Sequence, residues 1–508
     1  MKKNFAKKLI KRMSALLAGV VVLAGSSLTV HAEGKYTYCY DYWGEVQDSP
    51  DAYEVVKVFT SNELGLEKPI SPTASGLTVI GNYIYLCDTG NNRIIQWERI
   101  DREHFKLINI FTEFSGDVEV NTFNKPQDFQ INEDGNIFIA DTDNNRVLKL
   151  DSEWNYVMEF TKPDDNTLDK ELVFQPTKLA VDSAGRVYCI ATGINKGMIK
   201  YEADGTFSGF VGATPVVYDL WDYIWKRFFT TAAQREKMVS FVPTEYSNLY
   251  MDHDGFIYAC SSNLKEEDLK SGSAKAVRRL NLMGSDILIQ NGEFPVYGDI
   301  YMGAGGGYSG CSKIVDVTAF DNDTYVLCDK ERGRLFVYDS QGRLLFAFGG
   351  KGNMDGYFSK DQPIALDHMG YDLIALDSIS KTLTVFTPTE YGNMIYQAID
   401  QFDDGYYAES GETWQKVMDL NGNYDLAYIG VGRAMLRQER YKEALNYFEL
   451  KFDDDNYSKA FKQYRKEWVE DHILIIFLGA FAILIVPMII GKIGKIKHEI
   501  DTADIFKF

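Results

Sequence analysis

The sequence predicts a mainly-β protein: a six-bladed β-propeller, followed by a short α-helical module and a single transmembrane helix. Three observations support this. A turn motif recurs through the middle of the chain with a period of about 50 residues, a second repeat of about 34 residues follows it, and an apolar run lies near the C-terminus. With 508 residues the chain is too long for one ordinary core. An aromatic content of 14% favours strands.

Charge and cysteine usage narrow the possible functions. The formal net charge of −20 makes nucleic acid an unsuitable partner, because an acidic surface repels phosphate backbones. Three of the six cysteines fall at the same repeat position, directly before the turn motif: Cys87, Cys260 and Cys328. Equivalent strands of different blades diverge, so we expect these cysteines to be small buried hydrophobes rather than disulfide partners.

Residues 1–32 have the composition of a secretory signal peptide. An apolar stretch, 15–30, follows a basic start and ends in the small-residue pattern Val30-His31-Ala32. The basic side chains ahead of it are Lys2, Lys3, Lys7, Lys8, Lys11 and Arg12. We expect export of the remaining chain, with a mature start near Glu33. The alternative is an uncleaved anchor.

An uncharged apolar segment, 473–490, lies close to the C-terminus. As a helix it would extend about 27 Å, which is enough to span a bilayer core. We therefore expect a transmembrane helix at 472–491. Lysines follow this span, and export of the preceding chain also places the tail, 492–508, in the cytoplasm. The expected location is the cell membrane, single-pass, with most of the protein outside.

The middle of the chain is one repeated unit. Its clearest copies are Asp88-Thr89-Gly90-Asn91-Asn92-Arg93 and Asp141-Thr142-Asp143-Asn144-Asn145-Arg146, each between two apolar strands. Weaker copies begin at Ala191, Ser261, Asp329 and Asp377. A glycine-containing turn precedes each motif and another often follows it, so that three turns join four short strands. Four such strands make one propeller blade, and six units predict a six-bladed propeller over 33–387.

The sixth unit supplies only three strands before a helix begins. The segment 53–59 precedes the first blade and has no partner there. We predict that it provides the missing outer strand of the last blade and closes the ring. The alternative is that 394–398 supplies that strand.

A helical module is predicted at 388–471. The segment Thr387-Pro388-Thr389-Glu390 is a capping box, with its first threonine as the cap and proline at the first helical position. Tyr407 and Trp414 recur about 34 residues later as Tyr441 and Phe448. This spacing resembles the tetratricopeptide repeat, with roughly two units.

At its turn motifs the sequence resembles NHL-repeat propellers, whose units run strand, Asp-Gly-Asn, strand, Asp-Thr-x-Asn-Asn-Arg, strand. The segment Tyr40-Asp41-Tyr42-Trp43-Gly44 and the C-terminal anchor resemble a group of surface NHL proteins of Gram-positive bacteria. The resemblance covers nearly the whole chain. It implies the propeller fold, but it does not choose between enzymes and binding platforms, because propellers serve as both.

Long insertions between blades are the expected place for function on a rigid scaffold. The insertion 213–243 carries aromatic side chains at helical spacing, and 290–312 has a glycine-rich tip. The candidate binding residues are Trp221, Tyr223, Trp225, Phe228 and Tyr308. The aromatic stripe in 213–243 either faces a partner or plugs the top of the propeller.

Signals for catalysis are weak. The recurring motif aspartates are interpreted as turn caps that hold the local arginine. Lactonase-like propellers use carboxylates and asparagines around a central calcium, and Asp128 and Asp316 are weak candidates for such a metal site. No phosphate loop, nucleophile elbow or paired-histidine metal motif appears in the sequence.

Three classes of function remain open. The favoured one is a non-catalytic binding scaffold with a protein partner and no cofactor, acting as an accessory of an envelope or transport complex. The first alternative is a calcium-dependent hydrolase or lyase of the lactonase type. The second is a surface receptor for carbohydrate or peptide.

Overall fold

The computed structural model describes residues 37–213, 245–301, 310–359 and 364–504. The chain divides into two compact units, Met1–Asn393 and Met394–Phe508. The first unit is a six-bladed β-propeller and the second is helical, which confirms the predicted fold class.

Each blade is an antiparallel sheet whose first strand lies nearest the propeller axis. Blade 1 consists of β4 (Gly76–Ile80), β5 (Tyr83–Asp88), β6 (Arg93–Arg99) and β7 (Phe105–Phe111). Blade 2 consists of β8 (Pro126–Ile131), β9 (Ile137–Asp141), β10 (Arg146–Leu150) and β11 (Tyr156–Phe160). Blade 3 consists of β12 (Pro176–Val181), β13 (Val187–Ala191), β14 (Met198–Tyr201) and β15 (Phe207–Val211). The described strands of blade 4 are β16 (Asn248–Met251), β17 (Ile257–Cys260) and β18 (Val277–Leu280). Blade 5 contains β19 (Ile314–Ala319), β20 (Tyr325–Asp329), β21 (Arg334–Tyr338) and β22 (Leu344–Gly349). The first three strands of blade 6 are β23 (Ala365–Met369), β24 (Asp372–Asp377) and β25 (Thr382–Pro388).

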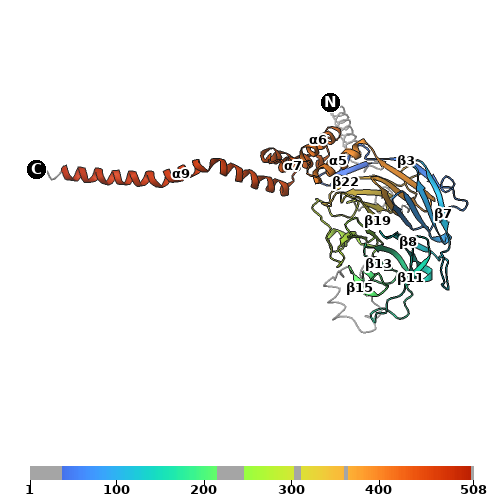
Figure 1. The fold of residues 1–508 in the computed structure, drawn as a ribbon. Helices are drawn as coiled ribbons and strands as arrows, with labels where there is room; N and C mark the ends of the chain where they lie inside the picture. The colour runs from blue at the N-terminus through green and yellow to red at the C-terminus, as the bar shows by residue number, and fades with distance from the viewer. Residues whose placement is uncertain (1–36, 214–244, 302–309, 360–363, 505–508) are drawn as a thin grey trace, which may run out of the picture. The chain divides into compact units, whose positions relative to one another are not determined.

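The ring closes through a strand from the N-terminal part of the chain. β3 (Tyr53–Thr60) pairs antiparallel with β25 and becomes the fourth strand of blade 6, with Phe59 opposite Leu383. In Figure 1 the blue strand β3 lies beside strands from the end of the propeller. The predicted closing strand is therefore confirmed. The alternative is wrong, because 394–398 lies within the helix α5 (Glu390–Asp403).

The closing strand also contacts the neighbouring blade. Phe59 is buried in a cluster that contains side chains of blades 1 and 6. Its ring stacks on that of Phe105 in β7, with 4.4 Å between the ring centroids. At the other end of β3, Tyr53 is buried and donates a hydrogen bond from its hydroxyl to the carbonyl of Tyr371. One strand thus joins the last blade to the first.

A short N-terminal hairpin extends blade 5. β1 (Thr37–Tyr40) pairs with β22, and β2 (Val46–Asp48) pairs with β1, which gives this sheet six strands. The hairpin is held by Tyr38, whose buried ring lies under the guanidinium of Arg334 at 4.8 Å. The sequence analysis did not predict these strands, because they are short and pair with a blade that lies far away in the sequence.

The helix that follows blade 6 begins two residues later than predicted. Pro388 is the last residue of β25, and Thr387 donates its hydroxyl to Asp372. The hydroxyl of Thr389 accepts the N–H of Gly392 at 3.2 Å, which is the bond of an N-cap to the third helical residue. The cap is therefore Thr389, because strand pairing with β3 keeps the two residues before it extended.

The helical unit contains the rest of α5 and four further helices. These are α6 (Tyr407–Leu420), α7 (Asp425–Arg437), α8 (Tyr441–Leu450) and α9 (Asp454–Asp504). Two glycines of α7 allow close helix packing. A Cβ at Gly430 would lie 2.6 Å from the ring of Trp414, and one at Gly432 would lie 2.7 Å from the ring of Phe448. The two recurring aromatic positions, one in α6 and one in α8, therefore pack against the same helix.

The last helix is unusually long and largely apolar. α9 has 51 residues and includes Pro487. Within the described residues it is the one helix long and apolar enough to cross a membrane, and its apolar segment is not buried. Membrane helices tolerate an internal proline.

Truncating the closing strand tests how strongly ring closure stabilises the propeller. Replacing Phe59 with Ala should lower the free energy of unfolding by about 3–5 kcal/mol, because a buried aromatic ring is lost. Chemical denaturation measures this, with Val157→Ala on an exposed position of β11 as the control. An effect as small as that of the control would show that β3 contributes little to closure.

Candidate functional site

The six inner strands place one equivalent residue each around the propeller axis. These residues pair with the position directly before the turn motif on the second strand of each blade. The layer consists of Gly76, Asp128, Lys178, Asn248, Asp316 and Ala365. The two aspartates proposed from the sequence are therefore brought to the axis together with a lysine and an asparagine.

The carboxylates of this region bond to the inner strand of a neighbouring blade. Asp128 accepts the N–H of Leu179 at 2.9 Å, which links blade 2 to blade 3. Asp316 accepts the N–H of Leu366 at 2.7 Å with one oxygen and the amide of Asn248 with the other, which links blades 4, 5 and 6. Three of the four oxygens of these two carboxylates therefore accept a hydrogen bond from another blade.

A third carboxylate, that of Asp367, lies in the inner strand of blade 6, two residues after the layer residue Ala365. Asp367 accepts the N–H of Val79 at 2.6 Å, which links blade 6 to blade 1. Its other oxygen accepts the hydroxyl of Thr318 at 3.1 Å, and this hydroxyl lies 2.6 Å from the imidazole of His368. Together, these three aspartates join most of the blades at the axis.

Lys178 supplies the positive charge of this layer. Its ammonium lies 3.8 Å from Asp128, and both side chains are largely buried. Burial disfavours the charged ammonium, but attraction from Asp128 and Asp316 outweighs it and raises the pKa of Lys178. The lysine therefore remains charged and compensates part of the negative charge at the axis.

Burial is the main influence on the pKa values of the carboxyl groups in the same layer. It raises the pKa of Asp128, although Lys178 and the backbone N–H of Leu179 oppose the shift. It raises the pKa of Asp316 to about 7 against the same kind of opposition from Lys178 and the N–H of Leu366. Asp316 thus changes its charge close to neutral pH.

The axial residues do not fit a calcium ion. Calcium takes about six to eight oxygen ligands, and its charge is opposed by a nearby cation. Both oxygens of Asp316 already accept hydrogen bonds, as does one oxygen of Asp128. The ammonium of Lys178 lies beside the remaining oxygen of Asp128 and would repel a divalent cation.

The motif aspartates fix the local structure in more than one way. Asp88 accepts the N–H of Ser71 at 2.8 Å and the guanidinium of Arg93 at 2.7 Å. Asp141 makes the equivalent bonds in blade 2, whereas Asp377 accepts the hydroxyl of Ser359 and backbone N–H groups. At Asp88 and Asp141 the predicted bond to the local arginine is confirmed, but the predicted turn cap is wrong, because neither side chain bonds a backbone N–H of its own turn. Asp377 does cap its turn, through the N–H groups of Ile379 and Ser380. All six cysteines are buried and none forms a disulfide; for Cys87, Cys260 and Cys328 this confirms what their repeat position indicated.

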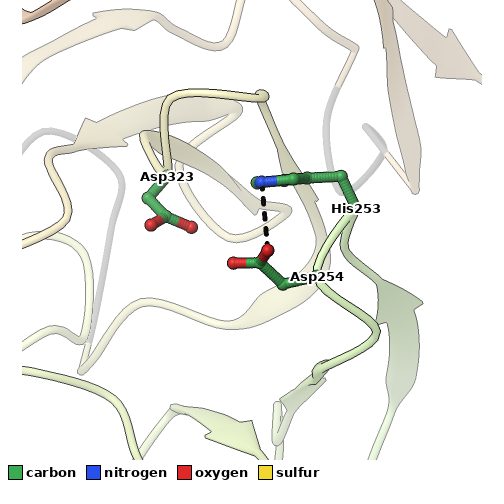
Figure 2. A group of neighbouring side chains, drawn as sticks. All are labelled: His253, Asp254 and Asp323. Atoms are coloured by element: carbon green, nitrogen blue, oxygen red, sulfur yellow. Dashed lines mark ion pairs between the residues drawn. The ribbon is translucent and has the colours of Figure 1, made fainter. Parts of the chain in front are cut away.

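One group of side chains on the opposite side of the blades could share a metal. The ligand atoms of His253, Asp254 and Asp323 lie within 4.8 Å of one another, and Figure 2 shows them converging from two neighbouring turns. The imidazole of His253 lies 3.5 Å from Asp254. Arg279, however, already bridges Asp323 at 2.8 Å and Asp254 at 3.3 Å, so the two carboxylates have a cation.

The sequence analysis missed several of these residues. Lys178, Asn248 and Asp367 gave no motif of their own; aligning the inner strands on the position before each turn motif would have found the first two. Asp323 meets His253 only because two blades are adjacent in space. The aromatic binding candidates Trp221, Tyr223, Trp225, Phe228 and Tyr308 lie outside the described residues.

Comparison with known families supports the repeat assignment. The NHL repeat family model matches residues 123–150, which contain the second copy of the turn motif. No curated protein matches the chain. The family match covers one repeat and therefore supports the repeat type rather than an activity.

Solved structures resemble this chain only remotely. Virginiamycin B lyase from Staphylococcus aureus shares 10% identity at a TM-score of 0.36, over 66% of this chain and 99% of that one. A streptogramin B lyase shares 11% identity at a TM-score of 0.39, over 67% and 100%. A protein of unknown function from Bacteroides thetaiotaomicron shares 10% at 0.41, over 66% and 76%. Likenesses at this level carry no argument about activity.

Removing the axial lysine tests the electrostatic account of the axis. Lys178→Met leaves buried Asp128 and Asp316 without their counter-charge, and should lower the free energy of unfolding by about 3–5 kcal/mol near pH 8. Loss of the ammonium raises the carboxyl pKa values further. A carboxyl whose pKa is raised on folding stabilises the protein below its unfolded pKa of about 4, and this contribution is lost as pH rises through the folded pKa.

The loss caused by Lys178→Met should therefore be smaller at pH 5 than at pH 8. Denaturant titrations at both pH values measure it, with Lys106→Met at an exposed position of β7 as the control. An equal loss at the two pH values would contradict the electrostatic account.

Proposed function

We propose that this protein is a membrane-anchored extracytoplasmic binding scaffold without catalysis, acting as an accessory of an envelope or transport complex. The observation that carries the proposal is the state of the propeller axis. Its carboxylates accept bonds from neighbouring blades, and the ammonium of Lys178 lies 3.8 Å from Asp128. The centre of the propeller is therefore committed to holding the ring together.

The membrane anchor in this proposal is the apolar part of α9. The segment 472–491 forms the span, and the tail 492–508 lies in the cytoplasm. The signal sequence in 1–32 exports the propeller, 33–387. The uncharged run and the lysines after it support this arrangement, and the resemblance to surface NHL proteins suggests a Gram-positive cell envelope.

The helices 388–471 are proposed to form a tetratricopeptide-like module beside the membrane. α6 and α8 begin 34 residues apart, at Tyr407 and Tyr441, and their aromatic side chains pack on glycines of α7. Tetratricopeptide units commonly form binding surfaces from stacked helix pairs. A module with so few units would depend on a partner or on other parts of the chain for stability.

The proposed topology can be tested by protease accessibility. Protease added to intact cells that lack their wall should remove the propeller and leave only a C-terminal fragment that begins near the outer end of the span, at about His472, and includes the tail from Lys492. Detection of the fragment through a C-terminal tag measures this, and detergent-permeabilised cells, in which the tag is also lost, provide the control. Protection of the propeller would reverse the orientation.

The binding role can be tested at the aromatic insertion. Replacing Trp221 and Trp225 with Ala should reduce the partner proteins that co-purify with the solubilised full-length chain, while the melting temperature changes by a few degrees at most. Trp43→Ala, at an exposed site in the N-terminal hairpin, is the matched control. Loss of a buried Trp would instead cost about 3–5 kcal/mol.

Two results would contradict the proposal. A collapse in stability of that size would show that the aromatic stripe is structural. Calcium-dependent turnover of lactone substrates by the purified chain, lost on Asp128→Ala or Asp316→Ala, would establish the enzyme alternative.

A further inference from the structure

The helices of the second unit run alternately toward and away from the apolar segment of α9. Short turns join consecutive helices, so each helix is antiparallel to the next. α8 and α9 pack together in a cluster that contains Ala444, Leu445, Phe448 and Ala460. Because α9 runs toward its apolar segment, the N-terminus of α8 faces the same way as that segment.

Two turns of this unit therefore face the apolar segment. They are 404–406, which precedes α6, and 438–440, which precedes α8. The two turns are neighbours, because the side-chain amide of Gln438 donates a hydrogen bond to the carbonyl of Tyr407 at 3.1 Å. Together they are named the proximal edge. The turns 421–424 and 451–453 form the distal edge at the other end of the helices.

The packing of α8 on α9 determines how far the proximal edge lies from the apolar segment. Ala444 and Leu445 share a cluster with Ala460, so in an antiparallel pair Arg440 is level with about residue 465. The uncharged run begins at Ile473, which is about 12 Å further along a helix. The headgroup layer of a bilayer is about 5–8 Å deep on each side. When α9 spans a bilayer, the proximal backbone lies just outside the headgroups, and side chains that extend from it reach them.

Amphipathic aromatic side chains occupy this zone. Tyr406, in the turn before α6, is 58% exposed, and Trp468, in the part of α9 just ahead of the apolar segment, is 47% exposed. Tyr441 is the first residue of α8, and side chains at a helix N-terminus lean toward that end. Tyr and Trp favour the boundary between lipid and water, because each combines an apolar ring with one hydrogen-bonding group.

Trp468 lies at headgroup depth and is oriented by its own helix. It precedes Ile473 by about 7–8 Å of helix. Its ring stacks on the imidazole of His472, with 4.5 Å between the ring centroids and 15° between the planes. The Nδ1 atom of His472 lies 2.8 Å from the carbonyl of Trp468. The indole is thus ordered at the level where an interfacial anchor is needed.

The charges of the proximal edge do not select a lipid class. Exposed Asp404 and Glu439 stand beside exposed Arg437 and Arg440. Arg440 also pairs with Glu443 at 2.5 Å. Anionic lipids attract clusters of basic residues, and this edge carries both signs. The chemistry of the edge therefore fits the lipid–water interface itself, contacted through aromatic rings, rather than a particular anionic headgroup.

We propose that the proximal edge of the helical unit rests on the outer surface of the lipid bilayer, with Tyr406, Tyr441 and Trp468 in the headgroup layer. This inference rests on the proposed membrane anchor and adds a second, peripheral contact to it. A single span leaves the attached domain free to tilt, and interfacial aromatic anchors restrict that tilt. The helical unit is thereby fixed against the membrane.

Quenching by spin-labelled lipid tests the proposal in the full-length protein. The protein is reconstituted in phosphatidylcholine nanodiscs that contain lipid with a nitroxide on the headgroup. One fluorescent label is attached at Asp404→Cys on the proximal edge or at Asn423→Cys on the distal edge, both exposed positions, while the native cysteines are buried. The label at 404 should lose most of its fluorescence and the label at 423 should keep it. Equal quenching at both positions would overturn the proposal.

Removing the rings tests whether they make the contact. With the label at 404, Tyr406→Ala combined with Trp468→Ala should restore most of the quenched fluorescence, and the melting temperature should stay unchanged because both side chains are exposed. Leu420→Ala, at a 56% exposed position at the distal end of α6, is the matched control and should leave the quenching as it was. Full quenching in the double variant would overturn the aromatic contact, as would quenching that requires phosphatidylglycerol.

A label inside the apolar segment separates this proposal from the anchor on which it rests. The label at Ile475→Cys should be quenched by lipid that carries its nitroxide on the acyl chain, because α9 spans the bilayer. Quenching at 475 without quenching at 404 would overturn the resting edge and leave the anchor standing. Fluorescence that persists at 475 would overturn the anchor and this inference together.

Discussion

Ring closure by β3 is the constraint on which the rest of the propeller depends. Each blade buries one face against the preceding blade and the other against the next, so none is stable until the first and last are joined. The strand that joins them lies before blade 1 in the sequence and pairs with the last strand of blade 6, across more than 300 residues. Such a non-local pairing is entropically costly, and the burial of Phe59 between blades 6 and 1 is what offsets part of that cost.

Closure in turn determines the chemistry of the axis. Six inner strands converge there, and their polar side chains lose water together. The structure satisfies them with one another: Asp128, Asp316 and Asp367 each accept an N–H of another blade, and Lys178 supplies charge. Removing one partner from such a network leaves the others buried and unsatisfied. A substitution at the axis therefore affects several blades at once.

The sequence predicted the features that depend on local pattern. The turn motifs at Asp88 and Asp141 indicated the repeat, and the strand at 53–59, which has no partner in blade 1, indicated how the ring closes. The sequence did not predict features that depend on a contact between residues far apart in the chain. The β1–β2 hairpin pairs with a distant blade, Lys178 meets Asp128 only across a blade boundary, and the helix cap moved to Thr389 because β3 holds Thr387 extended. Asp128 and Asp316 were placed near the axis correctly, but their role in joining blades required the structure.

The distribution of burial within a blade explains why blade 4 is stable with the three strands described. Second strands are buried almost completely, as in β5, whereas an outer strand such as β7 is largely half-exposed or exposed. An outer strand therefore contributes less apolar burial per residue than the strands inside it. Among the described residues blade 4 has three strands, and β16 and β17 still pack against blades 3 and 5.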